Sequence, residues 1–451
     1  MLIRFSVENF RSYKEKQIFS MIAGKHTKHK DHLVEIKGKR ILKGSFLFGA
    51  NAAGKSNLFE SIRFARNIIM KGIRKNSLIN KHFRIDDTCV NRPGVFQFDI
   101  FSNGHFYSYG FAISYTDAAI IEEWLYLCDG TETAVFERSM ENGNTIVNSS
   151  YRFSSDNHKQ TFTIFADNVP DNKTLLLEIS ERKLIEHEDF YPFRDVMQWI
   201  KDLIIILPDS TYRDKTNLFV DDESDFDLAK LLYEFDTGID GITLGKESAE
   251  EVLSFLPDKL KAEIIQDIEI AFNEKNADGQ MPQEIECEVG GRFIRFTKYN
   301  NQIVAAQLMM NHGNENDPFD LYDESDGTQR LFDLLPVYRA GRTEHVILVD
   351  ELDRSFHTVL VQKFIQGFYQ TSAYVNSQLI ASVHDSNIMN LDLLRQDEIW
   401  FVERSNDHSS RIYSLNRFQE RFDKKVAKDY LLGRYGAIPC FTQIVNDDAE
   451  D

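Results

Sequence analysis

The sequence predicts an α/β protein in which a mixed sheet with flanking helices is split into two lobes by a mainly helical insertion. A glycine-rich loop at 49–56 lies between an apolar run and an amphipathic pattern with helical spacing. A second apolar run, 346–349, is continuous, which is typical of a parallel strand buried on both faces. Residues 151–285 have mostly helical patterns. We therefore expect an N-terminal lobe at 1–150, the insertion at 151–285 and a C-terminal lobe at 286–451.

The glycine-rich loop, Gly49-Ala50-Asn51-Ala52-Ala53-Gly54-Lys55-Ser56, matches the phosphate-binding motif G-x-x-x-x-G-K-[ST] in full. Residues 41–48 before it predict a buried strand, and residues 56–70 after it predict a helix. In this arrangement backbone N–H groups and the helix N-terminus surround a phosphate. Lys55 would neutralise the β- and γ-phosphates, and the Ser56 hydroxyl would bind Mg²⁺, which prefers hard oxygen ligands.

The rest of the N-terminal lobe is predicted to be rich in strands. The expected strands cover 2–7, 96–100, 106–113 and 120–127. Asn103-Gly104 between two of them is a typical hairpin turn. Gln97 allows two interpretations, a glutamine that senses the metal and its water or an outward side chain of the sheet. The polar segment 24–39 contains His26, His29 and His32, whose spacing favours a polar loop over a rigid metal site.

The net charge of −19 hides an asymmetry along the chain. Residues 1–85 contain 19 Lys and Arg against 5 Asp and Glu, a net charge of +14, and the remainder contains 33 basic against 66 acidic residues, a net charge of −33. The basic end could face phosphates, a nucleic acid or an acidic protein; alternatively, the two parts attract each other or are solvated. The acidic remainder argues against a protein that coats DNA generally.

Composition also limits the class of protein. No apolar stretch approaches the roughly 18 residues of a membrane-spanning helix, and the N-terminus lacks the apolar segment of a signal peptide. The four cysteines form no C-x-x-C pair, which favours a reduced cytosol over a disulfide framework or a zinc site. They are Cys89, Cys128, Cys287 and Cys440. We expect a cytoplasmic protein with no membrane partner.

The insertion is predicted to be helical, without an internal repeat or a heptad run, which argues against a long coiled-coil arm. Its expected helical segments are 172–207, 226–236 and 248–274, and two strands are expected to follow at 284–289 and 293–298.

Chemistry-bearing residues return in the C-terminal lobe. Asp350 at the end of the 346–349 run is expected in the Mg²⁺ shell, and Glu351 is expected to polarise the attacking water. Alternatively, these are two solvated acids at a strand end. The next expected strand, 378–383, ends at His384, which could contact the γ-phosphate or be an ordinary histidine.

A second phosphate-binding segment is expected before the apolar run 346–349. Ser325-Asp326-Gly327-Thr328-Gln329 precedes an amphipathic helix, whose first N–H groups suit a phosphate. The same residues also form ordinary turns and helix caps. Their place before the strand that ends in Asp350 and Glu351 favours the phosphate-binding interpretation.

Together these motifs resemble the ABC-type ATPases of the SMC, RecF and OLD group, whose ATPase head is split by an insertion. The resemblance covers about residues 1–130 and 315–440 and implies an opening motif at Asn9-Phe10-Arg11-Ser12, the Walker A loop, the signature at 325–329, the Walker B pair and a switch histidine. The implied ATP-binding residues are Gly49, Asn51, Ala52, Ala53, Gly54, Lys55, Ser56, Asn57, Arg11, Gly327 and Gln329. The expected Mg²⁺ ligands are Ser56, Asp350 and Gln97, and the expected catalytic residues are Glu351, His384 and Ser325.

Enzymes of this group hydrolyse ATP that is held between two heads. Ser325 would therefore act in trans on the γ-phosphate bound by a second subunit, and the protein would be a homo-oligomer, from a dimer of heads up to a hexamer. The usual D-loop aspartate, seven positions after Asp350, is replaced by His357, which resembles the OLD branch. Only 67 residues follow His384, too few for the TOPRIM nuclease of OLD proteins.

The segment Glu324–Leu331 and the ending at 433–439 look most like stand-alone ATPase subunits of phage defence, such as the AriA type of the PARIS system and the RloA and AbiL types. The expected function is an ATP-hydrolysing sensor and scaffold of an anti-phage, abortive-infection system. It would control a separate effector, a TOPRIM-type nuclease, and respond to a phage-encoded trigger protein. The alternative is a RecF-like DNA-repair ATPase that clamps DNA. A nuclease in its own right ranks last, because no further carboxylate cluster is recognisable.

Overall fold

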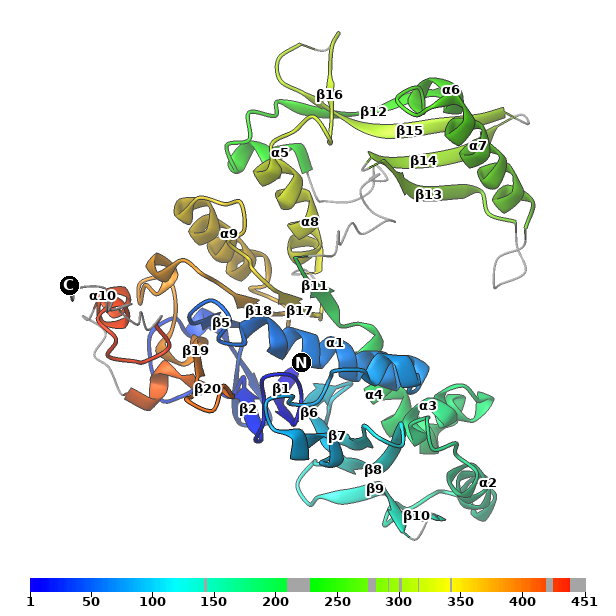
Figure 1. The fold of residues 1–451 in the computed structure, drawn as a ribbon, viewed down its shortest axis with the longest axis vertical. Coiled ribbons are helices and arrows are strands. Elements are labelled where there is room, and N and C mark those ends of the chain that lie inside the picture. The colour runs from blue at the N-terminus through cyan, green and yellow to red at the C-terminus, as the bar shows by residue number, and fades with distance from the viewer. Residues whose placement is uncertain are drawn as a thin grey trace, which may run out of the picture. The chain divides into compact units, whose positions relative to one another are not determined.

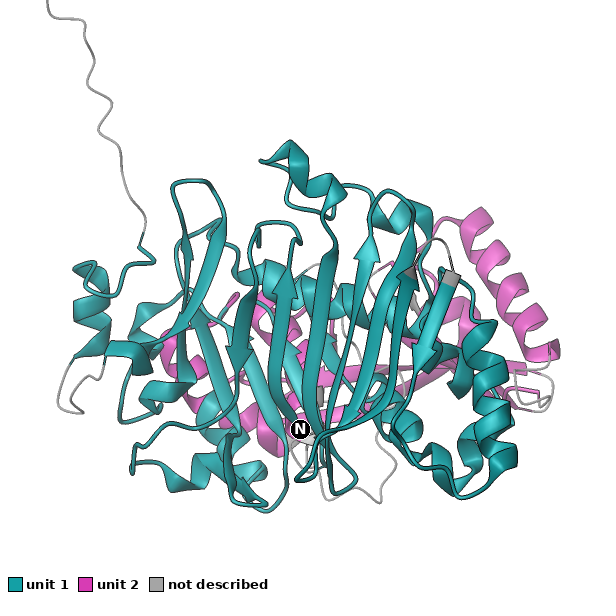
Figure 2. Cartoon of the chain, turned by 90° about the horizontal axis from the view of Figure 1, so that it is seen from below, with its two compact units in different colours: residues 1–210, 340–353, 364–451 teal, residues 211–339, 354–363 magenta. Residues whose placement is uncertain are grey.

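We describe the chain from a computed structural model (Figure 1). The described residues are 1–141, 144–208, 228–274, 281–290, 292–299, 302–314, 316–340, 343–418 and 425–438. The chain forms two compact units, coloured separately in Figure 2. Unit 1 contains residues 1–210, 340–353 and 364–451, and unit 2 contains residues 211–339 and 354–363. In the described ranges no helix is both long and apolar enough to cross a membrane.

The glycine-rich loop belongs to a six-stranded sheet of unit 1 with the order β11–β17–β18–β5–β19–β20. Its strands are β5 (Gly44–Phe48), β11 (Ile204–Ile206), β17 (Val346–Val349), β18 (Gln378–Ser382), β19 (Ile399–Arg404) and β20 (Ser410–Ser414). The first five strands of this order are parallel and β20 is antiparallel to β19. Every residue of β5, β17 and β18 is buried, as expected for central parallel strands. The predicted α/β class with a mixed sheet is confirmed.

A seven-stranded antiparallel sheet makes up the rest of unit 1, in the order β10–β9–β8–β7–β6–β1–β2. Its strands are β1 (Leu2–Glu8), β2 (Gln17–Ser20), β6 (Gly94–Ser102), β7 (His105–Ser114), β8 (Ala119–Leu127), β9 (Thr133–Glu141) and β10 (Asn144–Asn148). The predicted hairpin is confirmed, because Asn103 and Gly104 both have positive φ, 47° and 85°. Strands β3 (Leu33–Ile36) and β4 (Lys39–Leu42) form a small hairpin. The single strand expected at 41–48 is therefore two strands, since its first residues belong to β4 and the rest form β5.

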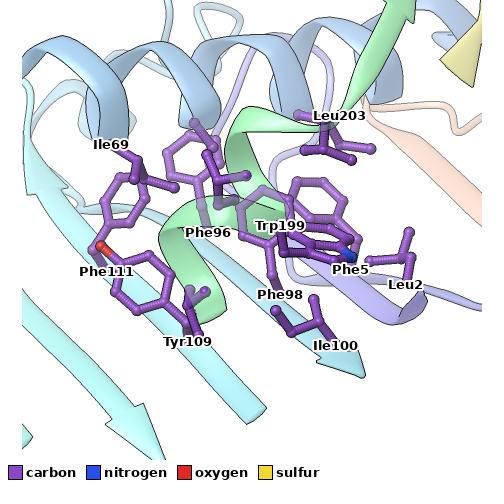
Figure 3. Close-up of a cluster of buried hydrophobic side chains, with 14 of the residues drawn as sticks. Leu2, Phe5, Ile69, Phe96, Phe98, Ile100, Tyr109, Phe111, Trp199 and Leu203 are labelled. Carbon is purple, nitrogen blue, oxygen red and sulfur yellow. The ribbon is translucent and has the colours of Figure 1, made fainter. Parts of the chain in front are cut away.

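One core cluster of unit 1 joins one face of the seven-stranded sheet to residues of the six-stranded sheet. Alternate residues of β6 are buried, and Phe98 lies 4.8 Å from Phe5 and 5.9 Å from Trp199 between ring centroids. Figure 3 shows these rings between the strands and helix α4 (Tyr191–Lys201). Burial of each such side chain stabilises the fold by about 1.5–3 kcal/mol. The other face of β6 carries polar side chains, among them Gln97 and Asp99.

The helices of unit 1 are α1 (Lys55–Lys71), α2 (Asp156–Asp167), α3 (Leu175–Ser180), α4 and α10 (Val426–Leu431). Helices α2 to α4 contribute to the same core as the seven-stranded sheet, through Phe162, Leu175 and Trp199. The expected division at 150/151 therefore does not separate the two units, because these helices bury their apolar faces in unit 1. The helix expected up to residue 207 ends at Lys201, and Ile204–Ile206 pairs with β17 instead.

Unit 2 contains a five-stranded antiparallel sheet covered on one face by helices. Its elements are α5 (Leu228–Glu234), β12 (Gly241–Ser248), α6 (Ala249–Val252), α7 (Asp258–Asn273), β13 (Glu284–Val289), β14 (Arg292–Tyr299), β15 (Gln302–Asn311), β16 (Phe319–Asp320) and α8 (Asp326–Ala340). Ile268 and Phe272 of α7 pack in one core cluster with Ile294 and Phe296 of β14. The strands at 284–289 and 293–298 are predicted correctly. Part of the expected helical insertion, β12, is instead a strand.

Helix α9 (Thr358–Thr371) crosses the division of the two units at 363/364. Within the described residues Cys89, Cys128 and Cys287 form no disulfide bond, and Cys440 lies outside these residues.

Candidate functional site

The glycine-rich loop between β5 and α1 has an unusual backbone. Gly49, Ala52 and Gly54 have φ values of 155°, 61° and 109°. A Cβ on Gly49 would lie 2.3 Å from the carbonyl oxygen of Val402, and a Cβ on Gly54 would lie 2.3 Å from Oγ of Ser410. Both positions therefore require glycine for space as well as for conformation. Close packing of the neighbouring strands holds the loop in its curved form.

Lys55 begins helix α1 and turns its side chain back over the loop. Its Nζ donates to the carbonyl oxygens of Gly49 at 2.7 Å and Ala50 at 3.3 Å, and the residue is 5% exposed. Burial lowers the pKa of the Lys55 ammonium, and nearby carboxylates, Asp350 first, oppose this shift. A buried ammonium facing acidic groups suits a role in neutralising a polyphosphate.

Ser56 and Asp350 come from distant parts of the sequence and meet at the ends of neighbouring elements. The Asp350 carboxylate accepts a hydrogen bond from Oγ of Ser382 at 2.5 Å, and the Ser56 hydroxyl lies close enough to lower the pKa of the same carboxyl. Asp350 is 2% exposed, and this burial raises the pKa of its carboxyl, while the two serine hydroxyls act in the opposite direction. A hydroxyl beside a carboxylate is a donor set of hard oxygens, which fits Mg²⁺.

Glu351 and His384 lie at the rim of this site. Oε1 of Glu351 is 3.6 Å from Nε2 of His384, and both side chains are partly exposed. The backbone N–H of Glu351 donates to Oγ of Ser382 at 2.8 Å, and Glu351 has a φ of 53°. Such a backbone is uncommon outside glycine and often occurs at functional sites. The structure thus brings together the predicted base, the predicted switch histidine and the predicted Mg²⁺ ligand.

Asp353 is a residue of this site that the sequence analysis misses. Its Oδ2 accepts hydrogen bonds from the backbone N–H groups of His384 at 2.8 Å and Asp385 at 2.7 Å. Its Oδ1 is buried and has no partner in the described part of the chain. Asp353 therefore fixes the segment that follows β18. The signal in the sequence is a third acid three positions after Asp350.

The opening motif contacts helix α1 and the loop. Arg11, with a φ of 48°, donates from Nη1 to Oδ1 of Asn57 at 3.3 Å. Asn57 in turn donates from Nδ2 to Oγ of Ser12 at 2.7 Å, and the Tyr13 hydroxyl donates to the carbonyl oxygen of Gly54 at 2.9 Å. Two of the predicted ATP-binding residues, Arg11 and Asn57, therefore lie beside the loop.

The predicted signature residues lie in unit 2, at the start of α8. Oγ of Ser325 accepts from the backbone N–H of Thr328 at 3.2 Å, so Ser325 caps this helix. A Cβ on Gly327 would lie 3.1 Å from the carbonyl oxygen of Ser355, and the Gln329 amide donates to two backbone carbonyls of the preceding turn. The ordinary-cap interpretation is correct for Ser325, and its action in trans stays a prediction.

Gln97 is not in hydrogen-bond contact with the predicted Mg²⁺ ligands. Its amide nitrogen donates to Oδ1 of Asp99 at 2.9 Å and to Oγ of Ser108 at 3.0 Å, on the polar face of the seven-stranded sheet. This arrangement favours the interpretation of Gln97 as an outward residue of the sheet. Its role as a metal ligand stays a prediction.

The family model described as "AAA domain, putative AbiEii toxin, Type IV TA system" matches residues 45–390. No curated protein matches the chain. Among solved structures, the chain is similar to an SMC head bound to the C-winged helix domain of ScpA, with 14% identity and a TM-score of 0.41 over 93% of this chain and 99% of that chain. It is also similar to the SMC head domain from Thermotoga maritima, with 11% identity and a TM-score of 0.32 over 92% and 98% of the two chains.

Proposed function

The chain belongs to the family described as "AAA domain, putative AbiEii toxin, Type IV TA system". From that premise we propose that it binds ATP with Mg²⁺ and hydrolyses it. The observation that carries the proposal is that the buried Asp350 carboxylate lies close to both the Ser56 hydroxyl and the buried Lys55 ammonium. These groups would hold Mg²⁺ and the phosphates, and Gly49 and Gly54 let the loop that carries them pack closely against Val402 and Ser410. Bound Mg²⁺ would neutralise charge on the phosphate oxygens.

The chemical roles follow from where each side chain lies. Glu351 is partly exposed and would accept a proton from the attacking water, while His384 beside it would contact the γ-phosphate. Asp353 would keep His384 in place through its backbone hydrogen bonds. Catalysis of this kind depends mainly on positioning and electrostatic stabilisation.

The direct test measures binding of a fluorescent ATP analogue and release of phosphate from ATP, with and without Mg²⁺. We expect Mg²⁺-dependent binding and turnover, both lost in Lys55→Ala. Gly104→Ala is a suitable control, because a Cβ there has no atom within 4 Å and Gly104 lies in the turn between β6 and β7 of the other sheet. Equal ATP binding by the wild-type chain and Lys55→Ala would contradict the proposal.

We further propose that two heads share each ATP, with Ser325 of one subunit acting on the γ-phosphate held by another. The helix that Ser325 caps would direct its free N–H groups and positive dipole at this phosphate. The oligomer would be a dimer or a larger assembly up to a hexamer. Its cellular compartment would be the cytoplasm.

The biological role we propose is a sensor and scaffold of a bacterial abortive-infection system that acts against phage. Support comes from the family description, which refers to a toxin of a type IV toxin–antitoxin system, and from the resemblance of the motifs to phage-defence ATPases. The chain would control a separate effector, a TOPRIM-type nuclease, and would respond to a phage-encoded trigger. Mass determination of the chain, co-expressed with its neighbouring gene and with or without ATP and Mg²⁺, tests this role. A complex larger than a dimer that retains the neighbour's product would support it.

The alternative is a DNA clamp of RecF type, for which the basic N-terminal residues are the argument. Several of these residues have acidic partners within the chain. Lys14 lies 2.9 Å from Asp86 and Lys37 lies 2.8 Å from Asp129. These pairs favour the interpretation that the basic end and the acidic remainder attract each other. Duplex binding that strengthens with ATP and weakens with salt would instead support the clamp.

A further inference from the structure

Three potential metal ligands meet near the 3-10 helix η1 (Lys30–His32), well apart in sequence from the nucleotide loop. Ligand atoms of His29, Asp31 and His32 all lie within 4.8 Å of one another. We propose that this cluster binds a divalent transition-metal ion of the zinc class. The sequence favours a polar loop over a metal site here, because the spacing of the three histidines suits no rigid site. The η1 turn changes this by placing the three side chains together.

His32 is fixed in the orientation that a metal ligand needs. Its Nδ1 lies 3.0 and 3.1 Å from the two carboxylate oxygens of Glu398, which can only accept, so Nδ1 carries the proton. The ring stacks on Tyr369 with 3.5 Å between centroids, and the Tyr369 hydroxyl donates to Glu398 at 2.9 Å. A carboxylate on one ring nitrogen leaves the other, Nε2, as the ligand atom, which is the usual arrangement of metal-binding histidines.

His29 is oriented in the same way by a different acceptor. Its Nε2 lies 3.0 Å from the carbonyl oxygen of Leu391, so this nitrogen donates and Nδ1 keeps a lone pair. His29 has a left-handed backbone, with φ 49° and ψ 57°, and its ring stacks on His32 with 4.8 Å between centroids. In the neutral form of each histidine, the ring nitrogen that makes no hydrogen bond is therefore the one available to a metal ion.

Asp31 completes the set. Its Oδ2 is 3.9 Å from Nε2 of His32, too far for a hydrogen bond. Zinc lies about 2.0–2.1 Å from a histidine nitrogen and about 2.0–2.2 Å from a carboxylate oxygen, so tetrahedral binding would draw the exposed Asp31 side chain slightly closer to His32. Two nitrogens and one oxygen leave the fourth tetrahedral position to water or to another ligand.

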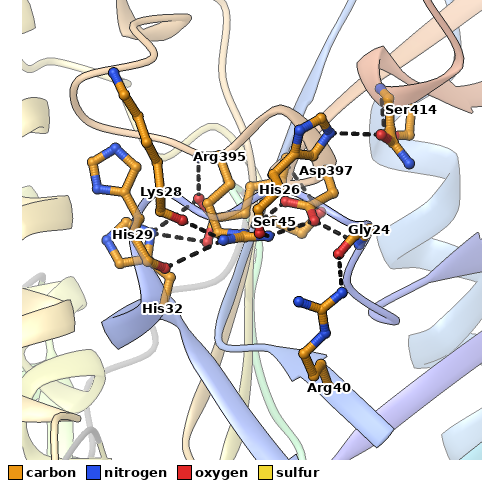
Figure 4. Close-up of polar contacts among 12 residues, drawn as sticks. Gly24, His26, Lys28, His29, His32, Arg40, Ser45, Arg395, Asp397 and Ser414 are labelled. Carbon is orange, nitrogen blue, oxygen red and sulfur yellow. Dashed lines mark hydrogen bonds and ion pairs between the residues drawn. The ribbon is translucent and has the colours of Figure 1, made fainter. Parts of the chain in front are cut away.

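The loop around this cluster is anchored by buried charges, shown in Figure 4. Arg395 is fully buried, is bonded to both carboxylate oxygens of Asp397 at 2.9 Å and donates to the backbone carbonyls of His26, Lys28 and His29. Its positive charge is thus met by Asp397, while Glu398 and Asp31 face the histidines. A site held by a fixed surrounding shell binds metal without a large ordering cost.

The test uses tag-free, metal-stripped protein with millimolar Mg²⁺ present to occupy sites of hard oxygens. Zn²⁺ is titrated against a chromophoric chelator, and Co²⁺ is added separately because its absorption spectrum reports tetrahedral nitrogen and oxygen ligands. We expect one Zn²⁺ per chain and a tetrahedral Co²⁺ spectrum. In His29→Ala and in Asp31→Asn the affinity should fall at least about tenfold. Both variants avoid the buried His32 and should fold normally.

His26→Ala is the matched control, since His26 belongs to the same loop but contacts Asn416 at 2.7 Å and lies outside the cluster. It should bind Zn²⁺ as the wild-type chain does. Absence of stoichiometric binding, or equal affinity of His29→Ala and the wild-type chain, would overturn the proposal. Lys55→Ala should leave Zn²⁺ binding unchanged, which separates this site from the ATP site.

Discussion

Asp353 holds the backbone of His384, since its Oδ2 accepts the His384 N–H at 2.8 Å. The same oxygen accepts the N–H of Asp385 at 2.7 Å. This contact links the segment that follows β17 to the segment that follows β18. These two neighbouring strands carry Asp350, Glu351 and His384 at their ends. The position of the switch histidine therefore depends on a carboxylate that is not itself expected to touch the substrate.

We predict that Asp353→Ala lowers kcat for ATP hydrolysis by about tenfold or more, because hydrogen bonds to a charged group contribute about 1.5–3 kcal/mol. KM should change less than kcat, because the hydrogen bonds of Lys55 are kept, although Asp353 is one of the carboxylates near Lys55. Asp353→Asn should recover part of the rate, since its amide oxygen can still accept both N–H groups. Steady-state kinetics of the three proteins check this. A fall in thermal stability with an unchanged kcat would indicate a purely structural role.

Removal of the Glu351 carboxylate should affect the chemical step alone. We predict that Glu351→Gln loses about 100-fold or more in turnover, the range typical of a missing general base. ATP binding should survive, because Glu351 is at the rim of the site and the amide keeps its size. Binding and turnover are measured on the same preparation. The control is Glu35→Gln, at an exposed side chain of β3. Near-normal turnover of Glu351→Gln would exclude this role.

The packing around Gly49 predicts a loss of ATP binding in Gly49→Ala. The new Cβ would lie 2.3 Å from the carbonyl oxygen of Val402, so the loop or β19 must shift. Gly104→Ala separates this clash from backbone strain, because Gly104 also has a positive φ, 85°, but no neighbouring atom within 4 Å. We expect Gly104→Ala to cost only about 1–2 kcal/mol of stability and to bind ATP normally. Equal ATP binding by both variants would contradict the clash.

His312 and Glu324 in unit 2 predict a pH dependence of stability. Nε2 of His312 lies 2.7 Å from Glu324, and this hydrogen bond raises the pKa of His312 above its ordinary value of 6.5. The stabilisation is therefore fully present below pH 6.5 and is lost as the pH rises through the raised pKa. We expect the difference in Tm between the wild-type chain and His312→Gln to be largest below pH 6.5 and to shrink as the pH rises above it. When Glu324→Gln is already present, adding His312→Gln should change Tm little further at any pH. A pH-independent difference would contradict this.

The strands beside the nucleotide loop are the part of the fold that the sequence predicts best. A continuous apolar run such as 346–349 has few alternatives once it ends in acids, and β17 is where it is expected. The run at 203–207 is equally apolar and is predicted wrongly as helical, although Ile204–Ile206 forms β11. Periodicity cannot distinguish a short buried strand from a buried helical segment. Residues 204–206 form a strand because they pair with β17, and this long-range contact is not visible in the local sequence.

The residues of the candidate site also differ in how far the sequence predicts them. Lys55 and Ser56 are predictable because their roles follow from short spacing within one motif. Ser382 and Ser410 are not, since they reach Asp350 and Ala53 only through the order of strands in the sheet. Gln97 is given a metal role by resemblance, yet its hydrogen bonds are to the polar face of another sheet.

The proposed action of Ser325 in trans predicts complementation between two inactive variants. Lys55→Ala and Ser325→Ala should each lose most ATP hydrolysis. In a mixed dimer, one of the two composite sites would combine the intact Lys55 of one subunit with the intact Ser325 of the other. With random mixing half of the dimers are mixed, so a 1:1 mixture should recover about a quarter of the wild-type rate if sites work independently. Phosphate release from unfolded and refolded mixtures measures this, and the double variant Lys55→Ala/Ser325→Ala mixed with wild-type chain provides the control. A mixture no more active than its separate components would show that Ser325 acts within its own chain or not at all.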